Sequence, residues 1–264
     1  MRVHIFTTDN IPADDERCRR VAKAFMDAGF QITDADDAQF IVSLGGDGTF
    51  LRAAHKFGAS GNPLLGINAG RLGFITAAAI DNVSDIALAM AKGEYRIERR
   101  SMLAASFSSD GNESDMFALN EMAVLKRDSA SMISSTVKLN HRELANYVGD
   151  GLIVSTPTGS TGYNLSVGGP ILEPTAPIFV ISPIAAHSLS LRPLVVSDRS
   201  VIDITTKSRS GSYLLSIDGH SITMPSGSEV SIYVAPHLLN VVHLHDQHFA
   251  NVLRNKLLWG VDNR

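Results

Sequence analysis

Hydrophobic and polar positions follow two different periods along the chain, and the change falls near residue 95. Before it, short apolar runs at residues 2–8, 38–45 and 63–69 have the length of buried strands. Between and after these runs, apolar residues recur at helical spacing over residues 12–28, 49–57 and 83–91. This order predicts an α/β N-terminal domain with right-handed crossovers and a mainly parallel sheet.

The ends of the predicted helices carry the residues that start and stop helices. Pro12 stands where a first helical turn would begin, and the acidic residues at 14–16 suit the positive end of a helix dipole. Gly29 and Gly93 each follow the last apolar position of a helical run. We therefore expect the first helix to begin near Pro12.

The second part of the chain has the pattern of a β-rich, sandwich-like C-terminal domain. Short segments rich in Val, Ile, Ser and Thr follow one another, and turn signals separate them. The segments cover residues 102–109, 116–125, 132–140, 144–155, 178–182, 200–207, 213–218, 229–235 and 239–245. A helical pattern returns over residues 245–259.

Composition narrows the class of protein. The 264 residues are 44% hydrophobic and 19% charged, which predicts a folded chain. A net charge of −4 argues against a nucleic-acid partner, because a phosphate footprint needs clustered Lys and Arg. The single cysteine, Cys18, excludes an intramolecular disulfide. The first ten residues lack a signal-peptide core, and prolines break the longest apolar stretch, so we expect a cytoplasmic protein with no membrane partner.

Several common motifs are absent from the sequence, and one histidine cluster is present. There is no P-loop, no G-x-G-x-x-G fingerprint, no G-x-S-x-G elbow and no H-E-x-x-H. His243, His245 and His248 form H-x-H-x-x-H, which could bind a metal. We favour a structural interpretation, with two histidines on one strand face and one at a helix start near the surface. No carboxylate or cysteine cluster accompanies them, so we assign no metal ligand.

Two glycine-rich segments follow the second and third predicted strands. The first, GGDGT at residues 45–49, places Asp47 at the carboxyl edge of the sheet, where α/β folds bind ligands. Glycines and a following helix bring N–H groups and a positive dipole to an anion. Asp47 could hold a metal or take a proton from an attacking hydroxyl; the alternative is an ordinary Asp-Gly turn with an N-cap. The second segment, residues 66–74, contains three glycines and forms another loop.

Two further segments carry polar side chains in the β-rich part. Asn120 and Glu121 interrupt the apolar stretch 116–125, and a buried unpaired carboxylate would be costly there. They face solvent or contact something polar. Residues 149–170, GDGLIVSTPTGSTGYNLSVGGP, form a strand with an acidic start and an exit rich in hydroxyls and glycines. Its short donors and Tyr163 suit a nucleotide, with the ring available for stacking.

Together these four segments resemble the NAD kinase family, which phosphorylates the adenosine 2′-hydroxyl of NAD. GGDGT, NAGRLGF, Asn-Glu and DGLIVSTPTGSTGYNLSVGGP occur in the family's order, and residues 187–196 and the pair Asp218-Gly219 extend the match over residues 38–225. GGDGT alone is shared with diacylglycerol, sphingosine and phosphofructo-kinases. Where the family often has Ala, a basic residue and Gln, this chain has Gly162, Val148 and His220.

The resemblance implies roles at the matching positions. Asp47 would be the catalytic general base on the 2′-hydroxyl. Phosphoryl transfer depends mostly on positioning and charge neutralisation, so a loop of N–H donors, Mg²⁺ and one base can suffice. Nucleotide-binding roles fall on Gly46, Gly48, Arg52, Phe74, Asn120, Glu121, Asp150, Thr158, Thr161, Gly162, Tyr163, Ser166, Ala185 and His220.

The resemblance also implies the domain arrangement, the partners and the assembly. Residues 240–264 would return to an α/β domain of residues 1–97, and residues 98–239 would form the NAD-binding and oligomerisation domain. NAD and ATP would be substrates, with ATP or polyphosphate as donor and Mg²⁺ or another divalent metal as cofactor. The protein would form a homotetramer or homodimer with shared sites. Two alternatives stay open: another GGDGT-type kinase acting on a lipid or sugar, and a non-catalytic NAD-binding sensor.

Overall fold

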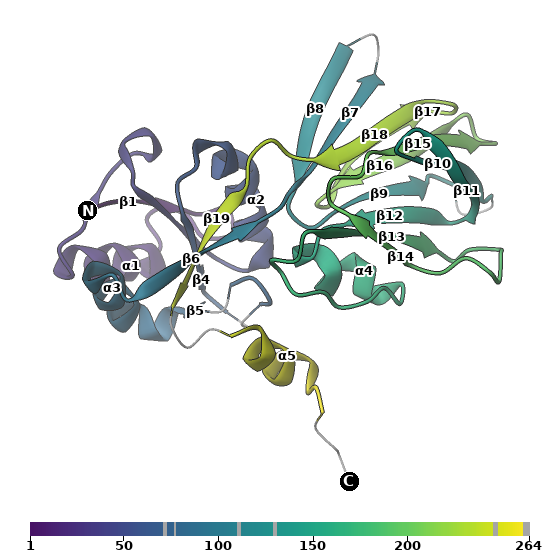
Figure 1. Cartoon of the computed structure of the whole chain (residues 1–264). Helices are drawn as coiled ribbons and strands as arrows, with labels where there is room; N and C mark the ends of the chain where they lie inside the picture. Colours follow the sequence, from purple (N-terminus) through teal and green to yellow (C-terminus); the bar gives the residue numbers. More distant parts are fainter. Residues whose placement is uncertain (71–72, 77, 110–111, 129–130, 245–247, 261–264) are drawn as a thin grey trace. The chain divides into compact units, whose positions relative to one another are not determined.

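The computed structural model describes residues 1–70, 73–76, 78–109, 112–128, 131–244 and 248–260 (Figure 1). The chain divides into two compact units. The first unit comprises Met1–Arg100 and Leu238–Arg264, and the second comprises Ser101–His237. The boundaries expected from the sequence, 97/98 and 239/240, lie a few residues from these.

The first unit is built on a seven-stranded sheet. Its strand order is β2-β1-β3-β4-β19-β6, and β5 also pairs with β4. All pairs are parallel except β19 with β6. β19, the last strand in the sequence, lies between β4 and β6. The strands are β1 (Arg2–Phe6), β2 (Gln31–Ile32), β3 (Phe40–Leu44), β4 (Leu64–Asn68), β5 (Ala78–Ala79), β6 (Tyr95–Arg100) and β19 (Leu239–Leu244).

Helices cover both faces of this sheet because its central strands are apolar on both sides. Val42 and Leu44 of β3 belong to one core with α1 and α3, whereas α2 packs Phe50 against Gly66, on the alternate positions of β4. This layering confirms the predicted α/β domain with a parallel sheet. The helices are α1 (Glu16–Asp27), α2 (Asp47–Phe57), α3 (Val83–Lys92) and α5 (Phe249–Leu257), with short 3₁₀ turns at Ala35–Asp37, Gly58–Ser60 and Ile80–Asn82.

Three helix starts differ from the prediction. The first helix begins at Glu16 rather than near Pro12, because the Asp15 side chain accepts the Arg17 N–H at 2.8 Å and caps the helix there. Asp47 and Gly48 open α2 instead of lying in the preceding loop, with Gly46 as the N-cap. The last helix begins at Phe249, and residues 245–247 of the predicted segment lie outside the described residues.

The second unit contains two antiparallel six-stranded sheets. One sheet, in the order β11-β10-β15-β18-β7-β8, consists of β7 (Leu103–Ser109), β8 (Asn112–Ala118), β10 (Ile133–Leu139), β11 (Arg142–Gly149), β15 (Ile202–Ser208) and β18 (Glu229–Val234). The other, in the order β14-β13-β12-β9-β16-β17, consists of β9 (Glu121–Lys126), β12 (Gly151–Ser155), β13 (Ile178–Ile184), β14 (Leu194–Ser197), β16 (Ser212–Ile217) and β17 (His220–Pro225). A 3₁₀ turn, η4 (Thr158–Thr161), and a short helix, α4 (Tyr163–Ser166), follow β12.

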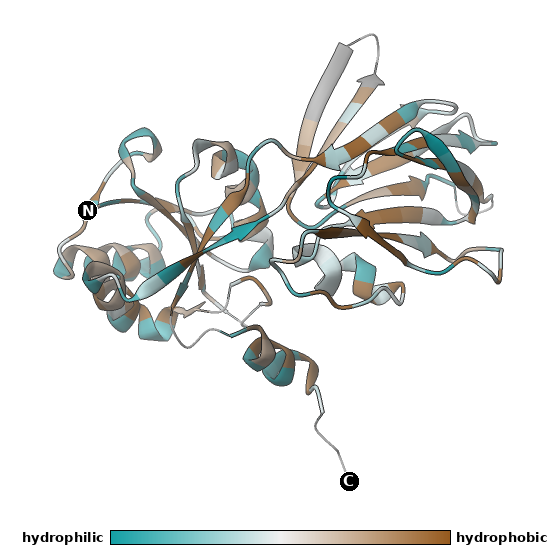
Figure 2. Cartoon of the chain, viewed as in Figure 1, coloured by the Kyte–Doolittle hydropathy of each residue, from teal (hydrophilic) through white to brown (hydrophobic). Residues whose placement is uncertain are grey.

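The two sheets of the second unit share one hydrophobic core. Leu103 and Ile204 of the first sheet and Leu152 and Phe179 of the second are all fully buried in it. Apolar and polar residues alternate along the strands, as the banding in Figure 2 shows on β18. The sandwich-like architecture expected from the sequence is therefore confirmed.

Two segments predicted as single strands are each divided between the sheets. Residues 116–125 break between Ala118 and Glu121, and residues 144–155 break at Asp150, so that each half joins a different sheet. A sandwich requires such crossings, and they fall where polar residues interrupt the apolar run. The prediction also missed β2, β5, β6, β14 and β17, which are either very short or rich in polar side chains.

No helix in the described part of the chain combines the length and apolar character needed to cross a membrane.

Candidate functional site

Asp47 stands at the carboxyl end of β3, where α2 begins. The sequence produces this corner because β3 is apolar to Leu44 and Gly45-Gly46 follow, with Gly46 extended as the N-cap. A bulkier residue at position 45 would collide with the Thr49 side chain. The first-turn N–H groups of an eleven-residue helix therefore lie beside the Asp47 carboxylate.

The Asp47 carboxylate accepts hydrogen bonds from the segment that follows β4. Its Oδ2 accepts the Phe74 N–H at 2.8 Å. Its Oδ1 accepts the Ile75 N–H at 3.3 Å, the Thr76 N–H at 3.0 Å and the Thr76 hydroxyl at 2.7 Å. The two glycine-rich segments of the sequence are thus joined through one side chain.

Gly73 makes this contact possible because a side chain at that position would occupy the space of the Asp47 carboxylate. An added Cβ would overlap Oδ1, Cγ and Oδ2 of Asp47. For Gly70, three residues earlier in the same loop, the one atom of the described residues within 4 Å of an added Cβ is the Asn68 Oδ1, at 3.9 Å. The glycine requirement in this loop is therefore strong at 73 and weak at 70.

The other site residues predicted for the first unit are close to Asp47 in the sequence or in the loop that contacts it. Gly46 and Gly48 are exposed on either side of Asp47, and Arg52 is exposed one turn further along α2. Phe74 is partly buried and contributes its backbone N–H to Asp47. The structure thus brings Phe74 together with Asp47 and leaves Arg52 solvent-facing.

In the second unit, Asn120 and Glu121 lie at the crossing between β8 and β9, where a carboxylate holds the backbone. Asp218 accepts the N–H groups of Leu119 at 2.7 Å, Asn120 at 2.9 Å and Glu121 at 2.9 Å. Asp218 and Gly219 both have positive φ (45° and 87°) and form the two-residue turn between β16 and β17. The hairpin turn therefore fixes the position of the polar pair.

Glu121 has an environment unlike that of a surface carboxylate. Burial, and secondly the negative Asp218, raise the pKa of Glu121 to about 7, against a smaller lowering by the Tyr163 backbone N–H. Its Oε2 is buried without a hydrogen-bond partner in the described structure, as are Asn120 Oδ1 and Thr158 Oγ1. Buried polar atoms are normally paired, so these three are available to a bound polar group.

The residues after β12 lie directly against this pair. A Cβ at Gly159 would overlap the Asn120 backbone, and one at Gly162 would stand 2.9 Å from the Glu121 Oε2. Tyr163 follows with 39% of its surface exposed. The structure therefore gathers most of the nucleotide-binding set predicted for the second unit. This set comprises Asn120, Glu121, Thr158, Thr161, Gly162 and Tyr163, with Ser166 exposed at the end of α4.

A buried network fixes the short helix that carries Tyr163. Asn164 is fully buried, and its Nδ2 donates to the carbonyls of Ser160 and Pro170, both at 3.1 Å. Its Oδ1 accepts the Ser182 hydroxyl at 2.6 Å. Asn164 thus ties α4 to β13.

Asp150 and Ala185 are neighbours at the other end of β12. The Asp150 N–H donates to the Ile184 carbonyl at 3.0 Å, and Ala185 has a positive φ of 45°. The Asp150 carboxylate forms an ion pair with Lys126 of its own chain at 2.7 Å. His220, by contrast, is exposed at the first position of β17.

Two of the three motif histidines lie where the structural interpretation expected them, His243 in strand β19 and exposed His248 at the start of α5. His243 is buried, and its Nε2 lies 3.2 Å from the Arg100 guanidinium and 3.5 Å from Glu98. Burial, and secondly Arg100, lower the pKa of His243 to about 4, so the ring is neutral at physiological pH. His245 lies outside the described residues, and among those described no three His, Cys, Asp or Glu side chains converge on a metal position.

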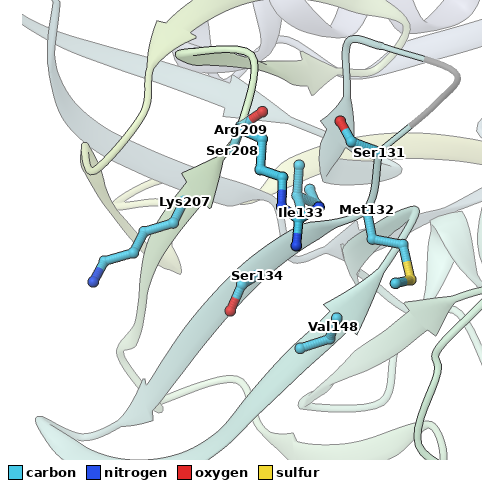
Figure 3. A pocket seen from close by; sticks show the side chains of 8 residues that line it. All are labelled: Ser131, Met132, Ile133, Ser134, Val148, Lys207, Ser208 and Arg209. Carbon is cyan, nitrogen blue, oxygen red and sulfur yellow. The ribbon is translucent and has the colours of Figure 1, made fainter.

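A cavity of about 410 Å³ lies in the second unit at the ends of β10, β11 and β15. Lys207 and Met132 stand on opposite sides of it in Figure 3. Its walls are Ser131, Met132, Ile133, Ser134, Val148, Lys207, Ser208 and Arg209. None of the predicted site residues lines this cavity.

Two buried residues of the first unit were missed by the sequence argument. Thr76 donates to Asp47, and Asn68 Nδ2 donates to the Thr76 hydroxyl at 2.8 Å. Both are almost fully buried. Asn68 is inside the second glycine-rich segment and could have been chosen as a polar residue ending a strand, whereas Thr76 carries no signal in the sequence.

Comparison with known proteins gives one consistent result. A family model described as "ATP-NAD kinase N-terminal domain" matches residues 5–95, and one described as "ATP-NAD kinase C-terminal domain" matches residues 119–244. An NAD kinase of Porphyromonas gingivalis is 46% identical over 221 residues, which cover 84% of this chain and 76% of that protein. An NAD kinase of Bacteroides fragilis is 42% identical over 228 residues, covering 86% and 79%.

Solved structures agree on the fold. A yeast NADH kinase complexed with NADH superposes with a TM-score of 0.88 at 20% identity, covering 100% of this chain and 89% of that chain. An NAD kinase from Archaeoglobus fulgidus in complex with ATP superposes with a TM-score of 0.80 at 28% identity, covering 97% of both chains.

Replacing Gly73 with Ala should lower the free energy of unfolding, because the new methyl group and the Asp47 carboxylate cannot share one position. We expect a loss of about 1–3 kcal/mol for Gly73→Ala, measured by urea denaturation. Gly70→Ala is the matched control in the same loop, with an expected change within about 0.5 kcal/mol. Equal stability of the two variants would contradict the described contact.

Replacing Glu121 with Gln should make stability less dependent on pH. The folded-state pKa of about 7 exceeds the ordinary 4.5, so the carboxyl does not oppose folding well below pH 4.5. It opposes folding increasingly as pH rises from 4.5 to 7, and by a constant amount above that. Glu121→Gln should unfold like the parent at pH 4.5 and be more stable at pH 8, by on the order of 3 kcal/mol at most. Urea unfolding at both pH values measures this. A gain at pH 4.5 equal to that at pH 8 would contradict it.

Proposed function

The chain belongs to the NAD kinase family, and we propose that it transfers the terminal phosphoryl group of ATP to the adenosine 2′-hydroxyl of NAD, giving NADP. The observation that carries the mechanism is the Asp47 carboxylate, held by four hydrogen bonds at the N-terminus of a helix. Phosphoryl transfer requires a positioned base for the attacking hydroxyl and N–H groups that bind the phosphate oxygens, and this corner supplies both.

In the proposed reaction, Asp47 accepts the proton of the 2′-hydroxyl as that oxygen attacks the γ-phosphorus of ATP. The new bond joins O2′ to phosphorus, and the bond between phosphorus and the β–γ bridging oxygen breaks, so ADP leaves. The N–H groups near Gly46 and Gly48, at the start of α2, bind the phosphate oxygens and the charge that develops on them. Arg52, exposed on the same helix, adds positive charge.

The proposed divalent cation, Mg²⁺ or another metal, fits this chain only as a companion of the donor phosphates. Among the described residues no three His, Cys, Asp or Glu side chains converge, so this part of the chain offers no dedicated protein cage. Mg²⁺ commonly keeps its waters and binds substrate phosphates with few protein ligands. When bound it neutralises phosphate charge, and we assign no residue of this chain to hold it.

We propose that the second unit binds NAD through the residues gathered at the β8–β9 crossing. The buried and unpartnered Asn120 Oδ1, Glu121 Oε2 and Thr158 Oγ1 support this role, because a polar ligand would satisfy them. The half-exposed ring of Tyr163 is available for stacking. We propose that six further residues contribute to NAD binding: Thr161, Gly162, Ser166, Asp150, Ala185 and His220.

We propose ATP rather than polyphosphate as the donor, and a cytoplasmic homotetramer or homodimer as the assembly. The ATP complex of the Archaeoglobus fulgidus relative supports the donor. Exposed apolar side chains around the edge strand β14, including Leu189 (90% exposed) and Val195 (43%), support self-association. One buried cysteine, with no intramolecular disulfide possible, suits a reducing compartment.

The direct test is NADP formation from NAD and ATP by the purified protein. A lipid or sugar kinase would leave NAD unchanged while phosphorylating its own acceptor, and a sensor would bind NAD without forming ADP. Parallel reactions with polyphosphate identify the donor.

Asp47→Asn should keep NAD binding and lose turnover by about 10²–10⁴-fold, because a positioned general base contributes that much. Steady-state NADP formation and calorimetric binding of NAD measure the two effects. Near-parental turnover of the folded variant would exclude Asp47 as the base.

Tyr163→Ala should weaken NAD binding by roughly 5- to 150-fold, the contribution typical of one stacked base. Tyr163→Phe retains the ring and should bind normally, and both variants should melt close to the parent because Tyr163 is 39% exposed. A large fall in melting temperature with unchanged affinity would assign Tyr163 to the core instead.

We propose that Asp150 acts on the ligand of a neighbouring subunit. Asp47→Asn and Asp150→Ala subunits, each inactive alone, should then recover part of the activity when mixed under exchange conditions. Light scattering and assay at one concentration provide the check. A fully active monomer, or exchange without recovery, would end this proposal.

A further inference from the structure

We propose that Thr76, oriented by Asn68, is a positioning residue that saturates one oxygen of Asp47 and leaves the other, Oδ2, as the atom that takes the substrate proton. The inference rests on the proposed role of Asp47 as the base. It assigns to two buried residues a task that neither the sequence motifs nor the ligand-binding set explain.

The two oxygens of Asp47 have unequal surroundings. Oδ1 accepts three hydrogen bonds, from the Ile75 and Thr76 N–H groups and the Thr76 hydroxyl, at 3.3, 3.0 and 2.7 Å. Among the described residues, one group donates to Oδ2, the Phe74 N–H at 2.8 Å. An ionised carboxylate has about four lone-pair sites, two on each oxygen. Oδ1 therefore has no lone pair left for a substrate, whereas Oδ2 keeps one.

The direction of the Thr76 hydroxyl is fixed by its neighbour. Asn68 Oδ1 accepts the Gly70 N–H at 2.7 Å, so the other end of the amide, Nδ2, faces Thr76 and can only donate. The Thr76 oxygen accepts that hydrogen bond at 2.8 Å, and its single proton is then free to point at Asp47. Asn68 thus makes Thr76 a permanent donor toward the carboxylate.

Packing keeps Thr76 in this rotamer. Its exposed fraction is 0%, and that of Asn68 is 2%. The Thr76 methyl group lies so close to Gly66 of β4 that a Cβ there would stand 2.9 Å from it, and Phe50 of α2 would be at the same distance. The hydroxyl therefore cannot rotate away without disturbing the contact between β4 and α2.

The consequence is a carboxylate whose reactive oxygen is chosen before substrate binds. With the Thr76 hydroxyl removed, Oδ1 loses the shortest of its three hydrogen bonds and keeps the two backbone N–H groups at 3.0 and 3.3 Å. The carboxylate is then held less firmly and can rotate or accept the substrate hydroxyl through the wrong oxygen. Misplacement of a reacting group by about 1 Å can cost on the order of 10²-fold in rate. Such an effect appears in kcat rather than in the KM for NAD or ATP, because the hydrogen bond acts on the base and not on either substrate.

The first experiment compares Thr76→Val, Thr76→Ser and Thr206→Val by steady-state kinetics of NADP formation. Thr76→Val should lower kcat by about 10- to 100-fold, with each KM within about threefold of the parent. Thr76→Ser keeps the hydroxyl and should restore kcat to within about threefold. Thr206→Val removes an equally buried hydroxyl from its bond with Ser135 in the second unit, and should reduce stability without changing kcat.

The second experiment is a double-mutant cycle with Asn68→Ala. Among the described residues, Asn68 Nδ2 donates to Thr76 and its Oδ1 accepts the Gly70 N–H. Asn68→Ala should therefore lower kcat alone, and the part of that loss that passes through Thr76 should not add to the loss in Thr76→Val. Asn68→Ala also gives a result if Thr76→Val fails to fold. Fully additive losses would overturn the relay, as would a Thr76→Ser variant as slow as Thr76→Val.

Asp47→Asn, assayed alongside, separates the two proposals. If Asp47→Asn is inactive and Thr76→Val has parental kcat, the positioning role is wrong and the base assignment stands. If Asp47→Asn is nearly as active as the parent, the base assignment fails, whatever Thr76 does.

Discussion

One carboxylate at the start of a helix joins the two loops of the first unit. β3 and β4 are adjacent parallel strands, so their carboxyl ends lie at the same edge of the sheet. The segments that follow the two strands are therefore neighbours. Asp47 holds them together by accepting four hydrogen bonds from residues 74–76. The lack of a side chain at Gly73 leaves room for that carboxylate, and the lack of one at Gly66 leaves room for the side chains of Phe50 and Thr76. A substitution at either glycine would therefore shift the Asp47 carboxylate through direct contact or through the side chains packed behind it.

In the second unit, too, a single carboxylate accepts several backbone N–H groups and fixes a segment of the chain. Asp218, at a hairpin turn with positive φ, accepts three consecutive backbone N–H groups where the chain passes from one sheet of the sandwich to the other. The side chains of Asn120 and Glu121 are thereby fixed with buried oxygens that have no partner of their own. In the proposed reaction the held Asp47 carboxylate accepts a proton, whereas Asp218 holds the backbone of the two residues that we propose bind NAD.

The sequence predicted the fold class because hydrophobic period and turn residues report secondary structure directly. It failed where a boundary depends on a single contact, such as the Asp15 cap that starts α1 at Glu16. It also failed at residues 116–125, because an apolar run that crosses between two sheets has the same local pattern as one strand. The GGDGT motif located Asp47, and the polar pair inside an apolar run located Asn120. Thr76 and Asp218 act through contacts 29 and 97–99 residues away in sequence, which no local pattern encodes.

Phosphorus NMR of the product formed from NAD and ATP shows where the phosphoryl group is transferred. We expect one new phosphomonoester, on the adenosine 2′-oxygen of NAD, formed in equal amount with ADP. A phosphoryl group at another hydroxyl, or ADP formed with free phosphate and unchanged NAD, would contradict it.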